Sequence, residues 1–432
     1  MSPDSETAHR DRLPPRNLTL AYLAFAYLCL AAALLILAAT PQSVGGFFYH
    51  PRMLAVVHLV TLGWITSSIL GTFHLIGPLA LRTVLRPGWA DYAACALVLT
   101  GIAGLVSHFW IDRYSGMVWS AGTLLAGLAY VAARAVTAVV RAPIQGGVKL
   151  HIVLAFANLL GAGVLGMLIG LEKQQIHVLP GYLLHTVYAH AHLAALGWAT
   201  MMVMGTAYRL FPMVLPAAMP KKSQTWVSAV LVEIGLIVLL LGLPASHRLA
   251  IGVGAAAIMA GLLAFFSQVL WMKRHPKRPP KGLQRPDFAT WHAMQAVGYL
   301  AVAAGLGAAL AFAPSGAWKI RAAMAYGVFG LIGFLAQIVL GIAARVLPMF
   351  AWIHLYVDSD FKVIPPSQYT MHSRGLQGIG FVLWTIGVPP LAWGLSFDRW
   401  AMISAASALL LTALACHAIN GVLIVRHAFV RA

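Results

Sequence analysis

Long apolar segments recur along the whole chain and are separated by short polar or basic stretches. Each segment holds the roughly 20 residues that an α-helix needs to cross the hydrocarbon core of a bilayer. We predict twelve spans, at residues 17–40, 51–78, 90–110, 117–140, 149–171, 182–212, 224–243, 248–272, 289–312, 321–347, 370–394 and 398–425. The pattern predicts an all-α polytopic membrane protein with twelve transmembrane helices.

Composition agrees with a lipid environment. Of the 432 residues, 60% are hydrophobic and 9% are charged, and the mean hydropathy is +0.82. A soluble domain carries about a quarter charged residues, so we expect no soluble domain. The three cysteines, Cys29, Cys95 and Cys416, all fall inside predicted spans. They therefore provide neither a disulfide framework nor a CxxC redox motif.

The formal net charge of +18 is distributed as in a membrane protein. With a cytoplasmic N-terminus, the cytoplasmic segments hold most of the 29 Lys and Arg residues, and the opposite side holds only Arg52, Arg113, Lys173, Arg248, Lys319, Arg321 and Arg399. The positive-inside rule then places both termini in the cytoplasm, as in a bacterial-type inner membrane. We interpret the basic run at 273–288 as a linker beside anionic lipid and expect no nucleic-acid partner.

One motif occurs three times. Residues 58–78 read "HLVTLGWITSSILGTFHLIGP", and residues 192–212 repeat the histidine, the Gly-Trp pair, the Gly-Thr pair and the closing proline at an offset of 134. Residues 328–348 read "VFGLIGFLAQIVLGIAARVLP" and keep both glycines and the proline at a further offset of 136. We expect the prolines to close these helices at their inner ends.

A weaker repeat aligns the start of the fifth span with the start of the ninth and pairs His151 with His292. Together the repeats predict three four-helix units in the same membrane orientation, related by a pseudo-threefold axis normal to the bilayer. The expected organisation is a cytoplasmic tail at 1–16, four-helix repeats at 17–141, 149–272 and 289–428, and the basic linker at 273–288.

Histidines within the motif are the candidate ligands. His58 and His192 hold the same repeat position, which Val328 fills in the third copy, so packing alone does not require an imidazole there. His190 lies about 200° around the helix from His192 and can serve a different site. Opposed imidazoles from two helices are what axial ligation of heme iron requires. The alternative is a buried, hydrogen-bonded histidine pair.

The architecture and the stretch "HAHLAALGW…GTAYRLFP" resemble subunit I of the heme-copper oxidase and nitric oxide reductase superfamily. In cbb-type oxidases and their relatives, an HxH pair ligates two hemes, one from each face of the helix. The resemblance implies His58 and His192 as ligands of a low-spin heme and His190 as the ligand of a second heme or metal. One or two hemes are expected, and they would be of b type because the chain has no CxxCH motif.

The chain departs from that family in two ways. Its histidine pair lies on the sixth predicted span, whereas the family has it on the tenth, and its seventh span contains no histidine to complete an oxidase-type copper site. A copper site of that type, and oxygen reduction with it, is therefore not expected. What remains is similar to the NnrS-like group of heme proteins associated with nitric oxide metabolism, or to short homologues of oxidase subunit I.

Two function classes follow. The first is a membrane heme protein in electron transfer or in nitric oxide or oxygen handling, which would be an oxidoreductase if it is an enzyme. A quinol or a cytochrome c would be its electron donor, and a diatomic gas its ligand. The second is a transporter of a metal, heme or small solute that uses the same histidines as transient ligands. Its proton-coupled group would be Glu233, the one acid that falls in the middle of a span.

The remaining histidines suggest two weaker sites. His185 and His177, with His50, are candidates for an exposed metal site on the outer side. An inner metal or heme site could be built from His74, His151, His292, His372 and His417. For each of these residues alone, snorkelling or a hydrogen bond at a helix end is the simpler interpretation. In the heme class, Glu233 would belong to a proton path.

Overall fold

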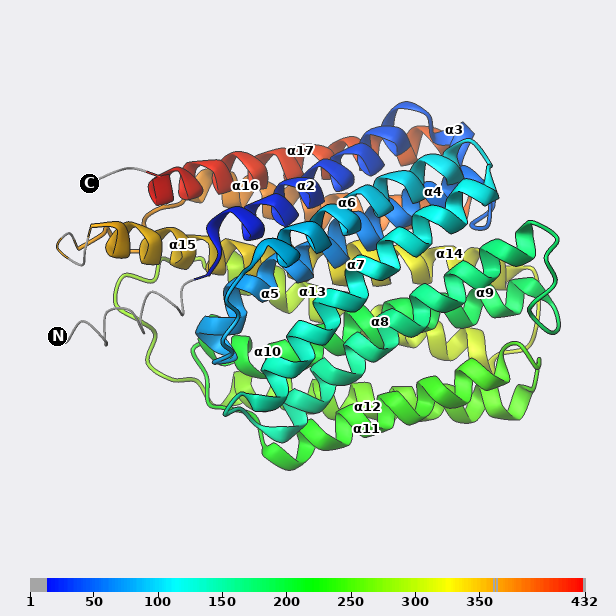
Figure 1. Ribbon diagram of the computed structural model, residues 1–432, viewed down its shortest axis with the longest axis horizontal. Helices are drawn as coiled ribbons and strands as arrows, with labels where there is room; N and C mark the ends of the chain where they lie inside the picture. Colours follow the sequence, from blue (N-terminus) through cyan, green and yellow to red (C-terminus); the bar gives the residue numbers. More distant parts are fainter. Residues whose placement is uncertain (1–13, 360–361, 363, 430–432) are drawn as a thin grey trace.

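The computed structural model describes residues 14–359, 362 and 364–429, so most of the predicted tail at 1–16 lies outside the described residues. The described part is helical and contains no strand. Its helices run side by side along the long axis of the molecule, and the start of α2 and the end of α17 lie at the same end of the bundle (Figure 1). The first unit of the sequence forms α2 (Arg16–Ala39), α3 (Pro41–Val44), α4 (Pro51–His58), the π-helix η1 (Leu59–Thr66), α5 (Ser67–Ala80), α6 (Trp89–Trp110) and α7 (Tyr114–Arg141).

The rest of the chain repeats this order of elements. The middle part forms α8 (Gly146–Lys173), α9 (Leu183–His192), η2 (Leu193–Thr200), α10 (Met201–Val214), α11 (Lys222–Gly242) and α12 (Arg248–Arg274). The last part forms α13 (Phe288–Phe312), α14 (Trp318–Val328), η3 (Phe329–Ala336), α15 (Gln337–Asp358), α16 (Arg374–Ser396), α17 (Trp400–Val425) and the short 3-10 helix η4 (Arg426–Phe429).

Within the described residues, eleven helices are long and apolar enough to cross a membrane. They coincide with eleven of the twelve predicted spans. The other predicted span, 182–212, is also helical, because α9, η2 and α10 follow one another without a break from Leu183 to Val214. This segment is less apolar than the eleven since it carries the histidine pair and Arg209. The fold is that of a polytopic membrane protein.

The backbone itself repeats at the motif. The three π-helical segments, η1, η2 and η3, each hold eight residues, and their first residues, Leu59, Leu193 and Phe329, are separated by the sequence offsets of 134 and 136. π-Helical turns are rare and often mark functional sites. The three segments also contact one another. The sequence motif therefore specifies one unusual backbone conformation three times, at a place where three long helices meet.

The expectation that proline closes each motif helix is wrong for α15, whereas α5 and α10 end two residues after Pro78 and Pro212. Pro78, Pro212 and Pro348 lie inside α5, α10 and α15, and α15 continues to Asp358. A helix tolerates proline when the unpaired carbonyl one turn earlier finds another partner or is left to bend the helix. The prolines therefore do not fix where these helices end.

Glycines fix how the first helix of each unit packs on the motif helix. A Cβ atom added to Gly205 would lie 2.6 Å from His151 Cβ, and one added to Gly341 would lie 2.9 Å from His292 Cβ. Gly71 meets Tyr22 Cβ at 2.9 Å in the same way. These contacts give His151 and His292 equivalent surroundings and identify Tyr22 as their counterpart near the N-terminus.

Helix contacts follow the same order around the bundle. The pairs α6 and α7, α11 and α12, and α16 and α17 each pack as neighbouring antiparallel helices. Further contacts join α7 to α8, α12 to α13, and α17 back to α2. The first and last described helices of the bundle therefore lie side by side (Figure 1).

A single side-chain hydrogen bond joins η2 to η1. Trp198 Nε1 donates to Thr66 Oγ1 at 2.9 Å, and both residues are buried. Trp64 has the place in η1 that Trp198 has in η2, but its indole nitrogen has no hydrogen-bond partner among the described residues. Thr66 corresponds to Ala336 in η3, which offers no acceptor side chain.

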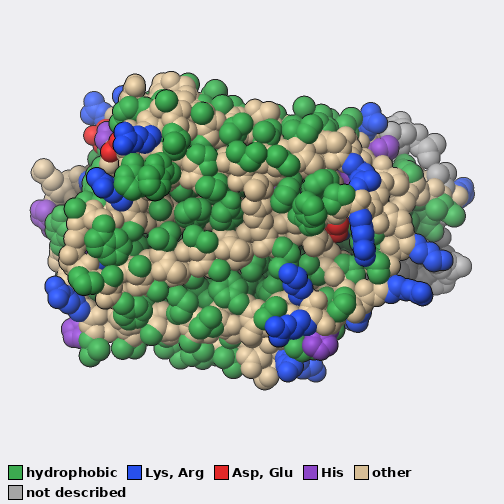
Figure 2. All heavy atoms as spheres, turned by 180° about the vertical axis from the view of Figure 1, so that it is seen from behind, with side chains coloured by type: hydrophobic (Ala, Val, Ile, Leu, Met, Phe, Trp, Pro, Cys, Tyr) green, Lys and Arg blue, Asp and Glu red, His purple; other side chains and the backbone are tan. Residues whose placement is uncertain are grey.

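The surface has the polarity of a membrane protein. Figure 2 shows a broad band of hydrophobic side chains across the middle of the molecule, with charged side chains gathered toward its two ends. On this face the basic side chains are more numerous at the end that carries the chain termini. Large apolar side chains such as Leu28 and Leu241 are more than two-thirds exposed, as expected for lipid-facing positions.

Candidate functional site

Three candidate ligands lie directly before the π-segments. His58 is the last residue of α4 and His192 the last residue of α9, while His190 precedes His192 on the same helix. They belong to the part of the bundle that lies away from the chain termini, where α4, α9 and α14 are found (Figure 1). The change from α to π winding begins with the residue after His58 and with the residue after His192.

Each of these imidazoles is anchored through one nitrogen. His58 Nδ1 lies 2.7 Å from the Leu54 carbonyl oxygen, His192 Nδ1 lies 2.7 Å from that of Tyr188, and His190 Nδ1 lies 3.0 Å from that of Ala162 on α8. A carbonyl oxygen can only accept, so Nδ1 carries the proton in the neutral ring. The lone pair is then on Nε2, which is the tautomer and orientation of a histidine prepared to bind a metal.

The paired histidines on α9 face different neighbours. His190 turns toward α8, where a Cβ added to Gly166 would lie 2.9 Å from its Cε1 atom. His192 stacks on Tyr326 of α14, with ring centroids 6.0 Å apart and an angle of 26° between the planes. The two imidazoles therefore belong to two separate regions of the bundle, one beside α8 and one beside α14.

His58 lies on the same side as His190. His190 lies against Gly166 of α8, and the neighbouring Met167 packs against the cluster of buried residues that contains Phe109. The ring of His58 stacks on Phe109 of α6, with centroids 4.7 Å apart and a 27° angle between planes. The resemblance implies a pairing of His58 with His192, whereas this geometry associates His58 with His190. A sequence comparison alone did not reveal Phe109 or Tyr326, because both come from helices far along the chain from the histidines they cover.

The wall beside His58 is apolar. A small cluster of buried residues from α4, α6 and α7 lies here, and Met167 of α8 packs against it; the buried members are Ala55, Leu105, Phe109, Met117 and Ala121. Small side chains and thioethers can adapt to a flat ligand. An apolar wall beside an imidazole whose Nε2 keeps its lone pair fits the chemistry of heme binding.

Glu233 is tied to one of the π-segments. Asn158 of α8 donates from its side-chain nitrogen to Glu233 Oε2 at 2.9 Å and to the Gly197 carbonyl of η2 at 3.2 Å. Gly197 leaves no room for a side chain here, since an added Cβ would lie 2.9 Å from Asn158 Cβ. The carboxyl group is therefore positioned against the segment that follows His190 and His192.

The outer candidates take separate partners. His177 pairs with Glu172 at 2.9 Å, and His185 Nδ1 lies 2.8 Å from Ser246 Oγ. His50 directly precedes α4. Within the described residues, no group of three or more His, Cys, Asp or Glu side chains is arranged to hold a metal ion.

The inner candidates are brought together only in part. His292 and His417 contact each other, with ring centroids 4.9 Å apart. His151 Nε2 lies 3.2 Å from Ser228 Oγ, and His74 stacks on Tyr22. His372 lies between α15 and α16, where burial and the nearby Arg345 guanidinium hold its pKa below the ordinary value.

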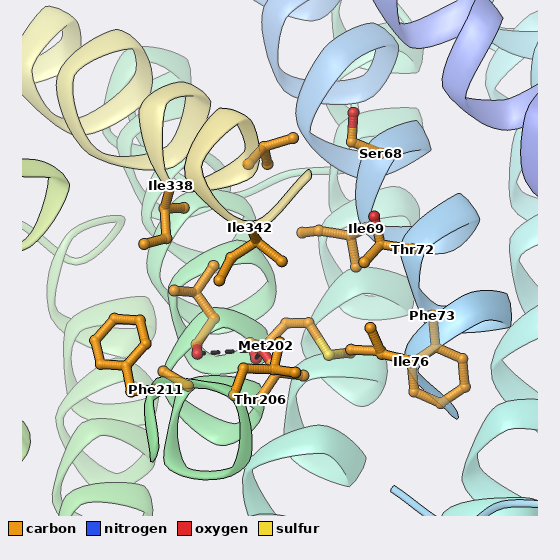
Figure 3. Close-up of a pocket in the computed structure, with 14 residues that line it drawn as sticks. Ser68, Ile69, Thr72, Phe73, Ile76, Met202, Thr206, Phe211, Ile338 and Ile342 are labelled. Atoms are coloured by element: carbon orange, nitrogen blue, oxygen red, sulfur yellow. Dashed lines mark hydrogen bonds between the residues drawn. The ribbon is translucent and has the colours of Figure 1, made fainter. Parts of the chain in front are cut away.

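A cavity of about 50 Å³ lies between α5, α10 and α15. Figure 3 shows side chains from these three helices converging on it. Ser68, Met202 and Ile338 hold one repeat position in this lining, and Thr72, Thr206 and Ile342 hold another. The lining is mostly apolar and contains no histidine, so this cavity is separate from the candidate ligands.

No protein-family model and no curated protein matches the chain. The described residues have the fold of an all-helical, multi-pass membrane protein. The candidate site is therefore argued from the side chains described above and not from a relative.

Proposed function

We propose that the chain is an integral-membrane heme-binding protein that carries electrons or handles a diatomic gas such as nitric oxide or oxygen. The observation that supports this most is the set of three histidines beside the π-segments, each with Nδ1 held by a carbonyl oxygen and its lone pair on Nε2. Iron in b-type heme is held by such imidazoles. The heme would be of b type, in one or two copies.

We assign the ligands by the neighbours they face. His58 and His190 would hold one heme from α4 and α9, since both lie beside the apolar cluster that contains Phe109. His192 would hold a second group beside α14, where Tyr326 covers its ring. When bound, the iron supplies one-electron chemistry and, where a single imidazole holds it, a position for a diatomic gas.

The chain's own groups orient and shield this site. The carbonyls of Leu54, Ala162 and Tyr188 fix the imidazole rings, and the apolar cluster around Phe109 excludes water. Glu233 would hold or release a proton beside η2, where Asn158 supports its carboxyl group. Quinol or a cytochrome c would supply electrons.

The architecture we propose is twelve spans in three four-helix units around a pseudo-threefold axis. The π-segments at offsets of 134 and 136, the repeated glycine contacts and the closed order of helix contacts support it. We place both termini in the cytoplasm of a bacterial-type inner membrane, because most basic residues fall in the segments on that side.

Absorption spectra of the purified full-length protein test this proposal. After expression with added heme, we expect a Soret band and a low-spin α-band, and the α-band should disappear in His58→Ala and in His190→Ala. His192→Ala should keep the α-band and lose any spectral response to carbon monoxide. His177→Ala is the matched control, since this histidine is exposed.

Two results would contradict the proposal. Protein without heme would favour the alternative, a transporter of a metal, heme or small solute. Loss of the α-band in His58→Ala and His192→Ala, with His190→Ala unchanged, would instead support the pairing that the resemblance implies. Oxygen consumption should stay at the level of His190→Ala, because α11 carries no histidine for an oxidase-type copper site.

A further inference from the structure

A second pair of histidines meets deep in the last part of the chain. His292 of α13 and His417 of α17 contact each other with ring centroids 4.9 Å apart and a 65° angle between planes. His292 is fully buried and His417 is 6% exposed. The Nε2 atom of each ring is buried without a hydrogen-bond partner among the described residues. Buried ring nitrogens are normally paired, so two adjacent ones without a protein partner mark a place that can take a ligand.

Glycine keeps the space beside one of these nitrogens open. A Cβ added to Gly380 of α16 would lie 2.8 Å from His417 Nε2 and 3.0 Å from its Cδ2. Any larger residue at this position would push against the ring edge that carries the free nitrogen. On the other side, Phe381 meets His292 edge to face, with centroids 5.0 Å apart. The space is therefore small and bounded by apolar groups.

An amide network controls which nitrogen of His292 carries the proton. The side-chain nitrogen of Gln337 lies 3.3 Å from His292 Nδ1 and 3.1 Å from Gln295 Oε1, and Thr385 Oγ1 lies 2.8 Å from Gln295 Oε1. With the amides oriented in this way, His292 Nδ1 accepts a hydrogen bond from Gln337, so Nε2 carries the proton of the neutral ring.

The same network can run in the opposite direction. If both amides turn, Gln295 donates to the Gln337 oxygen, which accepts from His292 Nδ1. The Thr385 hydroxyl can then accept from the Gln295 side-chain nitrogen, because it donates its own hydrogen to the Phe381 carbonyl oxygen, 2.8 Å away. Nε2 of His292 is left with a lone pair next to His417. The network is thus compatible with a ligand that needs two imidazole lone pairs.

We propose that His292 and His417 bind one cuprous ion through their Nε2 atoms. Two imidazoles are sufficient for a linear Cu(I) complex, whereas Zn²⁺ sites in proteins are almost always completed to four ligands. The described residues offer no third His, Cys, Asp or Glu side chain for a larger cluster. A single positive charge is also less costly to bury than a double one. The assignment does not rest on heme binding at His58 and His190.

Cuprous-ion titration of the metal-free, full-length protein tests this site. Under anaerobic, reducing conditions with bicinchoninate as the competing chelator, we expect one tightly bound copper per chain, with two nitrogen ligands in X-ray absorption. His292→Gln and His417→Gln should each weaken binding at least tenfold. His74→Gln is the matched control, because His74 is also buried and has one unpartnered nitrogen, but it stacks on Tyr22 and not on a histidine.

Gly380→Ala provides a test that keeps both histidines. The added methyl group should crowd His417 Nε2 and weaken copper binding, while Gly375→Ala, near the start of the same helix and with only Ser373 Oγ 3.9 Å away, should not. Binding that persists in His417→Gln, or that falls equally in His74→Gln, would overturn the proposal, as would no binding by the unmodified protein. Heme content, read from the Soret band, should be the same in all these variants, so failure of the copper site and failure of heme binding are distinguishable.

Discussion

Replacing Gly166 by alanine should displace His190, one of the heme ligands that we propose, without changing its own side chain. The added Cβ would lie 2.9 Å from His190 Cε1 and 3.4 Å from Nδ1, which is too close for the ring to keep its place. The ring can move, because it is the end of a side chain. In moving, it loses the 3.0 Å hydrogen bond to the Ala162 carbonyl.

The expected size follows from these two changes. A lost hydrogen bond costs about 1 kcal/mol, and turning a side chain about 30° away from its rotamer costs about 1 kcal/mol more. Together, about 2 kcal/mol corresponds to roughly a 30-fold weaker hold on the heme that His190 would bind. Alanine also favours the helix over glycine by about 1 kcal/mol, which offsets part of this cost in the folded protein.

Heme titration of Gly166→Ala against Gly163→Ala measures this effect. Gly163 lies on the same helix, and its added Cβ would meet only the terminal Cδ1 of Leu125, at 2.8 Å. The helix-propensity gain is common to both variants, so the difference in heme affinity reports the displaced ring. Equal affinity in the two variants would refute the assignment of His190. Loss of the gas response without loss of the low-spin band would place His190 apart from His58.

Two further predictions concern the hydrogen bond between η1 and η2 and the histidine that precedes α16. Trp198→Phe should lower the free energy of unfolding by about 1 kcal/mol through loss of the hydrogen bond to Thr66. Trp64→Phe should lower it less, because the indole nitrogen of Trp64 has no partner among the described residues. Equal losses of stability in thermal denaturation would argue against the hydrogen bond. His372 lies outside the spans, and burial, together with Arg345, lowers its pKa, with Asp287 and Arg374 also nearby. The unfolded chain then binds a proton at His372 more readily, so this contribution to stability should be complete above about pH 6.5 and fall as the pH drops below it. In His372→Gln the thermal unfolding midpoint should change less between about pH 7.5 and 5.5 than in the unmodified protein. The same dependence on pH in both proteins would contradict this.

The helical spans could be predicted because each depends on local hydropathy. The predicted 90–110 and the observed Trp89–Trp110 differ by one residue. Boundaries were less predictable where proline was involved: the expected end near residue 347 was wrong because α15 passes through Pro348 and continues to Asp358. The repeat offsets located the three π-segments, although nothing in the sequence identified their winding as π.

The candidate site could be predicted only in its residue types. The sequence placed His58 and His192 at one repeat position and set His190 apart from His192, but ring directions depend on neighbours contributed by other helices. Gly166 and the Ala162 carbonyl draw His190 toward α8, and Tyr326 covers His192 from α14. The contact between His292 and His417 likewise joins helices more than a hundred residues apart, so spacing along the chain could not reveal it.

The three π-segments also carry a record of ancestry. A π-turn accommodates one residue more than an α-turn, so such a segment arises most simply from a single inserted codon. The insertion occupies the same place in η1, η2 and η3, at unbroken offsets from the surrounding glycines and prolines. If the three proposed units arose by triplication of one gene, a single earlier insertion explains this with fewer events than three later ones. The histidine shared by the first two copies was then either lost from the third or gained before the first two diverged.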